Sequence, residues 1–238
     1  MNIRIILLFI LFHAAGFAIT VFAQEPLNPN WDAEKIKGTR YIPYPIYDGF
    51  PFLNDSWLPG KIEFASGEIA DSLYLRYSSF KDEVVYYNEA ITTQIVIDKA
   101  SLNGFSFTEK DGRTRVFRKQ YFDGFMKGDR YFEVLSDGET DLLAYRKVIL
   151  ITISPYKDQN NILKNLAYDP NYQYYFYSPA NGYSSVRMNL GALLSKFDKV
   201  SQKSIKKLLR KNRIKITDEF SFVYAWKLVE KEGFTMIF

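Results

Sequence analysis

The chain has 238 residues, 31 Lys and Arg against 27 Asp and Glu for a formal net charge of +4, and no Cys. No disulfide framework can form, so stability must come from a hydrophobic core. The one histidine is His13, so the rest of the chain lacks the imidazole and thiol groups of most nucleophilic triads and zinc sites. We therefore predict no catalytic residue, no metal site, no cofactor and, from the nearly balanced charge, no nucleic-acid partner.

Residues 1–23 predict a signal peptide. Arg4 gives a short positive start, residues 5–22 are almost wholly apolar, and the run ends at Ala23 with the small residue that a cleavage site needs. Cleavage there leaves 215 of the 238 residues, with 30 basic and 27 acidic side chains. We expect a secreted cell-envelope protein, periplasmic or extracellular. An uncleaved anchor is the alternative, because the run is about long enough to span a bilayer.

Residues 24–60 predict an extended lead-in, because they contain six of the nine prolines. Their aromatic residues either hold the segment against the core, which we favour, or line a carbohydrate or lipid groove. These residues are Tyr41, Tyr44, Tyr47, Phe50 and Phe52. Residues 61–238 then form a single β-rich domain.

Short strands are predicted through the middle of the chain. Its 18 Tyr and 20 Phe suit a pleated, half-buried surface. The expected strands cover residues 61–65, 73–78, 83–88, 94–98, 104–108, 113–118, 131–135, 142–154 and 172–177. Asp111-Gly112 and Asp137-Gly138 lie between such runs, as hairpin turns require. The pattern indicates an antiparallel meander.

Helical spacing replaces this pattern at about residues 189–230. Leu190, Leu193 and Leu194 begin it, Ser201 is the predicted N-cap of the second helix, and Thr217 or Asp218 that of the third. The expected fold is mainly β (α+β), a curved antiparallel sheet or open barrel-like meander with two or three short C-terminal helices.

Several short motifs resemble a family of uncharacterised exported proteins of Bacteroidota, whose domain has no known function. They are Gly49 to Trp57 (GFPFLNDSW), Leu75-Arg76-Tyr77, Asp82-Glu83-Val84, Asp137-Gly138, Leu142-Leu143 and Tyr174-Tyr175-Phe176. The chain departs from the pattern at Ser78 and in the acidic run that begins at Asp218. The resemblance implies export and fold and brings no activity. Within these motifs the candidate ligand-binding residues are Asn54, Asp55, Trp57, Arg76 and Tyr77.

The second predicted helix is strongly basic. Its candidate membrane or partner contacts are Lys203, Lys206, Lys207 and Arg210. Basic residues opposite an apolar side are typical of a helix lying on anionic lipid and also of a helix that covers a sheet. We favour the second interpretation.

The leading hypothesis is an exported, non-enzymatic binding or assembly module that uses a β surface or groove for an envelope partner or small ligand. One alternative is a carboxylate-dependent hydrolase of glycan or peptidoglycan. Its available carboxylates are Asp55, Asp82, Glu83, Asp123 and Asp129. The second alternative is a structural surface protein or a peripheral protein in contact with anionic membrane.

Overall fold

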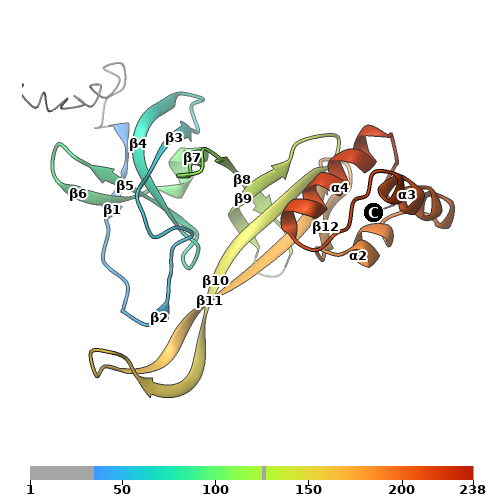
Figure 1. Cartoon of the computed structure of the whole chain (residues 1–238). Coiled ribbons are helices and arrows are strands. Elements are labelled where there is room, and N and C mark those ends of the chain that lie inside the picture. The colour runs from blue at the N-terminus through green and yellow to red at the C-terminus, as the bar shows by residue number, and fades with distance from the viewer. Residues whose placement is uncertain (1–34, 125–126, 238) are drawn as a thin grey trace, which may run out of the picture. The chain divides into compact units, whose positions relative to one another are not determined.

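The computed structural model describes residues 35–124 and 127–237, all of which fall within one compact unit, Trp31–Phe238. Residues 1–23, where a signal peptide is predicted, lie outside the described residues. Within the described part, twelve strands form one open, mostly antiparallel sheet that is followed by three short helices (Figure 1). This confirms the predicted mainly β class with C-terminal helices. None of the helices in these ranges is long and apolar enough to cross a membrane.

The nine predicted strands occur in the predicted order, and seven of them are longer than the sequence patterns indicate. Three further short strands were not predicted. The strands are β1 (Gly38–Arg40), β2 (Asp48–Gly49), β3 (Leu58–Phe64), β4 (Ile69–Ser78), β5 (Glu83–Asn88), β6 (Thr93–Ile97), β7 (Leu102–Thr108), β8 (Thr114–Phe122), β9 (Gly128–Ser136), β10 (Asp141–Lys157), β11 (Leu163–Ser178) and β12 (Gly182–Val186). A 3-10 turn, η2 (Lys99–Ser101), precedes β7, and the helices are α2 (Leu190–Leu194), α3 (Lys199–Lys211) and α4 (Glu219–Lys231).

The sheet is a meander with three departures from sequence order, at β1 beside β6, at β3 beside β7 and at β2 beside β11. Its strands run β1-β6-β5-β4-β3-β7-β8-β9-β10-β11-β12, and β2 pairs in parallel with β11. The hairpin of β10 and β11 is the longest of the described part, with strands of 17 and 16 residues (Figure 1). The sequence predicted only the second half of β11, because the first half contains Pro170 among polar residues and shows no clear alternation.

One hydrophobic core, here called the sheet core, lies within the curve of β3 to β9. Phe105 on β7 and Phe117 on β8 are directly opposite each other and stack with ring centroids 4.6 Å apart. The buried side chains of this core are Ile36, Leu58, Ile62, Phe64, Ala70, Leu73, Leu75, Tyr77, Val84, Tyr86, Ile97, Leu102, Phe105, Phe107, Phe117 and Tyr131. Alternating strand residues therefore bury one face of the meander, as the aromatic pattern predicts.

Part of the lead-in packs against this sheet. Phe52 is buried and pairs with Ser78 at the end of β4. The hydroxyl of Tyr44 lies 2.9 Å from Oγ of the same serine. These contacts match the interpretation that aromatic residues hold the segment in place.

A second core, here called the helix core, lies between the last strands and the helices. Phe176 on β11 packs against Trp226 on α4 with ring centroids 4.5 Å apart, and Phe222 lies beside them. Its buried residues are Leu142, Phe176, Val186, Leu193, Leu194, Phe197, Ile205, Leu209, Phe222, Ala225, Trp226 and Val229. The buried residues of α3 and α4 recur at i, i+3 or i+4 and form one face of each helix. Leu190, where the predicted helical spacing begins, is 39% exposed.

The helix N-termini include one correction. Ser201 is not the N-cap of α3, because the side chain of Asp198 accepts hydrogen bonds from the backbone N–H groups of Val200 and Ser201. Ser201 therefore lies inside the first turn. For α4 the N-cap is Asp218, one of the two predicted residues, and its capping box includes the Ser221 side chain.

Phe222→Ala is expected to lower the free energy of unfolding by about 3–5 kcal/mol, because it leaves a cavity in the helix core. Phe220→Ala is the matched control, since this ring on the same helix is 82% exposed. It should change the value by no more than about 0.5 kcal/mol. Urea unfolding followed by circular dichroism measures both. Equal, small losses would show that α4 does not depend on packing against β11.

Candidate functional site

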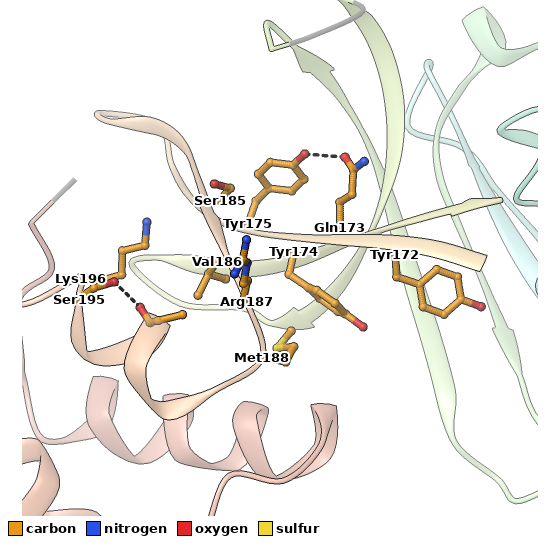
Figure 2. Close-up of a pocket in the computed structure, with 11 residues that line it drawn as sticks. Tyr172, Gln173, Tyr174, Tyr175, Ser185, Val186, Arg187, Met188, Ser195 and Lys196 are labelled. Atoms are coloured by element: carbon orange, nitrogen blue, oxygen red, sulfur yellow. Dashed lines mark hydrogen bonds between the residues drawn. The ribbon is translucent and has the colours of Figure 1, made fainter. Parts of the chain in front are cut away.

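A groove of about 610 Å³ lies where β12 ends beside β11 (Figure 2). It is lined by Tyr172, Gln173, Tyr174, Tyr175, Ser185, Val186, Arg187, Met188, Ala192, Ser195 and Lys196. These residues come from the second half of β11, from β12 and the turn after it, and from α2 and the residues that follow it. We call this hollow the tyrosine groove.

Strand alternation decides which way the β11 side chains of the tyrosine groove point. Tyr172 and Tyr174 extend to one side of the strand and Gln173 and Tyr175 to the other, as Figure 2 shows. On the second side the Tyr175 hydroxyl donates a hydrogen bond of 2.8 Å to Oε1 of Gln173. The groove therefore reaches both faces of the sheet around the end of β12.

The charged side chains of the tyrosine groove are both cationic. They are Arg187, which is exposed, and Lys196, and the eleven lining residues include no Asp or Glu. Nζ of Lys196 donates a hydrogen bond of 2.7 Å to Oγ of Ser184. Burial lowers the pKa of Lys196. In the part of the chain that the structure describes, Arg187 has no ion-pair partner, so its guanidinium can receive an anion.

A buried arginine lies directly behind these tyrosines. Arg146 on β10 is 3% exposed, and its guanidinium donates two hydrogen bonds, of 2.7 and 2.8 Å, to the carboxylate of Glu219 at the start of α4. The same carboxylate accepts a hydrogen bond of 2.7 Å from the Tyr174 hydroxyl. The guanidinium carbon also lies 4.9 Å from the ring centroid of Tyr172. The two tyrosines are thus fixed from behind by one ion pair.

This ion pair belongs to a longer series across three neighbouring strands. Nε of Arg146 donates a 2.5 Å hydrogen bond to Glu133 on β9, and Arg115 on β8 donates two more to Glu133, of 2.7 and 2.5 Å. Arg115 also donates to Glu109, at 3.2 Å. We call Glu109, Arg115, Glu133, Arg146 and Glu219 the ion-pair chain. Its three middle members are at most 9% exposed, so it replaces hydrophobic packing between the two cores.

The ion pair of Arg146 and Glu219 keeps both of these groups charged. Burial opposes the charge of Arg146, but hydrogen bonds and attraction from Glu219 and Glu133 outweigh it and raise its pKa. Burial likewise opposes ionisation of Glu219, yet Arg146 and the Tyr174 hydroxyl lower its pKa. Burial and the hydrogen bond to Glu219 raise the pKa of Tyr174 to about 12. Tyr174 therefore stays protonated at neutral pH and is a hydrogen-bond donor rather than a base.

A second hollow, of about 450 Å³, lies at the other end of the ion-pair chain. Its lining includes Asn54, Asp55, Glu109 and Asp111. Nδ2 of Asn54 donates a hydrogen bond of 3.1 Å to Glu109. The two predicted ligand-binding residues Asn54 and Asp55 thus come together here.

The other predicted ligand-binding residues divide between two faces of β4. The guanidinium carbon of Arg76 lies 5.4 Å from the Trp57 ring and 3.9 Å from the Phe52 ring, so Arg76 and Trp57 come together. Tyr77 points the opposite way into the sheet core, is 1% exposed, and donates a hydrogen bond of 2.7 Å to Asp82. Neighbouring residues on a strand face opposite sides, so Arg76 and Tyr77 cannot share a surface site.

The predicted contacts of the basic helix all lie on the exposed side of α3. They are Lys203, Lys206, Lys207 and Arg210. Ile205 and Leu209 on the other side are buried in the helix core. Residues 187–238 contain twelve Lys and Arg against five Asp and Glu, a net charge of +7, so this part of the chain is far more basic than the whole.

Arg187, Met188 and Lys196 are groove residues that sequence reasoning missed. The excess of basic residues after residue 186 could have indicated a cationic site. Because β12 was not predicted, however, nothing in the sequence placed these three residues beside β11. Among the described residues, no group of three or more His, Cys, Asp or Glu is arranged to hold a metal ion. Of the carboxylates considered for hydrolysis, Asp82 is 5% exposed and is bonded to Tyr77 and Lys99.

No protein-family model, no curated protein and no solved structure matches this chain. Three surface features therefore indicate what this protein can bind: the tyrosine groove, the hollow at Asn54 and the exposed side of α3. The resemblance to exported proteins of Bacteroidota stays a prediction.

Arg146→Met is expected to lower the free energy of unfolding by about 3–5 kcal/mol, because it leaves the buried carboxylate of Glu133 and the partly buried carboxylate of Glu219 without their shared cation. Arg210→Met, on the exposed side of α3, removes the same charge and should have an effect below about 0.5 kcal/mol. Urea unfolding at neutral pH measures both. A loss for Arg146→Met no larger than for the control would contradict a structural role of the ion-pair chain.

Proposed function

We propose that this protein is an exported, non-enzymatic binding or assembly module of the cell envelope, and that the tyrosine groove receives its ligand or partner. The observation that carries the proposal is the lining of this groove. Three tyrosine rings, Met188 and two cations surround a hollow of about 610 Å³. Concave sites with apolar walls and a few convergent polar groups are the usual form of a binding site.

The chemistry of the lining favours non-covalent recognition. A tyrosine offers a large contact area with few rotatable bonds and a hydroxyl that can donate a hydrogen bond. The ion-pair chain holds Tyr172 and Tyr174 in place before anything binds, and a preorganised surface loses less conformational entropy on association. The raised pKa of Tyr174, caused by burial and by its hydrogen bond to Glu219, makes it a poor base and supports a binding role.

The hydrolase alternative has less support. The hollow at Asn54 has three carboxylates in its lining, those of Asp55, Glu109 and Asp111. Burial opposes ionisation of Glu109, but hydrogen bonds from Arg113, Asn54 and Arg115 outweigh it and lower its pKa. A glycosidase instead needs one carboxyl group with a raised pKa to protonate the leaving group.

Membrane contact through α3 is the second candidate function. Besides the net charge of +7 in residues 187–238, the helices expose apolar side chains to solvent, most of all Val200 at 76% and Phe220 at 82% exposure. Basic residues with exposed apolar neighbours are typical of helices that lie on anionic lipid.

Ala192→Trp should abolish binding, because a large ring on α2 would fill the tyrosine groove. The full chain is expressed with its predicted signal and purified from the envelope fraction, and native and denaturing mass spectra are compared. We expect a mass excess that disappears on denaturation for the parent protein and for Leu190→Trp, which lies outside the lining, but not for Ala192→Trp. The same excess in all three proteins would contradict binding in the groove.

Replacing Lys206, Lys207 and Arg210 together by Gln tests the second candidate. If α3 binds membrane, sedimentation with liposomes that contain one third phosphatidylglycerol should fall at least tenfold, because three charges are each worth about 1 kcal/mol near an anionic surface. The control replaces Lys37, Arg40 and Lys157, which are also exposed. Equal sedimentation of the two triple variants would remove this candidate.

A further inference from the structure

The outer edge of β11 is interrupted. β2 pairs with it at Ala167 and Tyr168, and β12 pairs with it from Tyr174 to Ser178. Between these two partners, residues 169–173 pair with β10 on one side and, within the described ranges, with no strand on the other. We call this stretch the edge gap, and its last two residues, Tyr172 and Gln173, also line the tyrosine groove.

The pairing register shows which backbone groups the edge gap presents. The N–H of Val148 on β10 donates to the carbonyl of Ser79, at 3.0 Å, and so points away from β11. Its opposite residue is Pro170, and opposite residues in an antiparallel pair either exchange both hydrogen bonds or neither. The carbonyl of Pro170 therefore faces the gap, as do both backbone groups of Tyr172 two residues later.

Two features make the edge gap suited to a guest strand. Tyr174, the next residue in this alternation, already pairs with Val186 of β12, so the gap continues an existing ladder. At about 3.3 Å per residue, the five residues of the gap match an extended segment of about 17 Å. An open edge of this kind is the site to which an extended peptide adds as a new strand.

The charges beside the edge gap select an acidic guest. Arg187 and Lys196 lie in the groove at the β12 end, where the lining has no carboxylate. The one acid of the gap itself is Asp169, next to the β2 end. A guest should therefore place its carboxylates toward β12.

We propose that the edge gap accepts an extended acidic segment of another protein, which completes the sheet between β2 and β12 by strand addition. This inference rests on the proposed function, because it names the class of partner that the tyrosine groove takes. Backbone pairing with Pro170 and Tyr172 supplies the geometry, and Arg187 and Lys196 supply the charge preference.

The test uses blocked peptides of sequence Thr-Val-Thr-Val-Glu-Glu with the ¹⁵N-labelled protein and NMR titration. The acidic peptide should bind saturably and slow exchange of the Tyr172 amide. In an added strand, every second N–H donates to the neighbouring strand. Two variants of the acidic peptide are therefore compared, one N-methylated at the odd positions and one at the even positions. One of them should bind at least tenfold more weakly than the unmethylated peptide, and the other should bind about as well. The peptide with Lys in place of Glu should also bind at least tenfold more weakly.

Arg187→Glu should weaken binding of the acidic peptide at least tenfold, whereas Arg40→Glu, a control at an exposed position on β1, should leave binding within twofold. Equal binding of both N-methylated peptides, with sensitivity to Arg187→Glu, would overturn strand addition but leave a groove that binds acids. If none of the acidic peptides binds, the inference is also overturned. The proposed function would then still be judged separately, by whether the mass excess of the parent protein is lost in Ala192→Trp. If the protein without peptide forms a dimer that buries the Tyr172 amide, the acidic guest is overturned and the occupant of the edge gap is a second copy of this chain.

Discussion

The guanidinium of Arg146 is the contact on which the rest of this structure depends. It joins Glu133 on β9 to Glu219 at the start of α4, which lies 73 residues after Arg146 in the sequence. Through Glu219 it also fixes the Tyr174 hydroxyl, and through its own face it contacts Tyr172. One side chain therefore attaches the helices to the sheet and supports one wall of the tyrosine groove.

The ion-pair chain is a costly way to join two cores. Buried ions lose several kcal/mol of hydration each, and well-packed apolar residues often give equal or greater stability. What the ions add is geometry, since a guanidinium that donates two hydrogen bonds to one carboxylate allows one orientation. Here that orientation positions the two tyrosines from behind, which is why we connect the ion-pair chain to binding rather than to stability alone.

Local patterns predicted the fold better than the site. The strand at Glu83–Asn88 follows from its β-branched and aromatic residues, and the helices after Asn189 follow from helical spacing, because these signals lie within a few residues of each other. The tyrosine groove instead depends on β12 pairing with β11. The ion-pair chain depends on Glu133, 13 residues before Arg146 on the neighbouring strand, and on Glu219, 73 residues after it at the start of α4. One error was avoidable, because a predicted strand that contains Arg76 and Tyr77 already places them on opposite faces.

We infer that the ion-pair chain makes the helices and the strands behind the groove one cooperative unit, so that they unfold together. Native-state amide hydrogen exchange of the purified protein tests this most directly, since it gives an opening free energy for each segment. We predict that buried amides of α4, around Phe222 and Trp226, exchange with the same opening free energy as those of β9 and β10. Exchange of α4 at a free energy several kcal/mol lower would contradict the account, because the helices would then open without the strands.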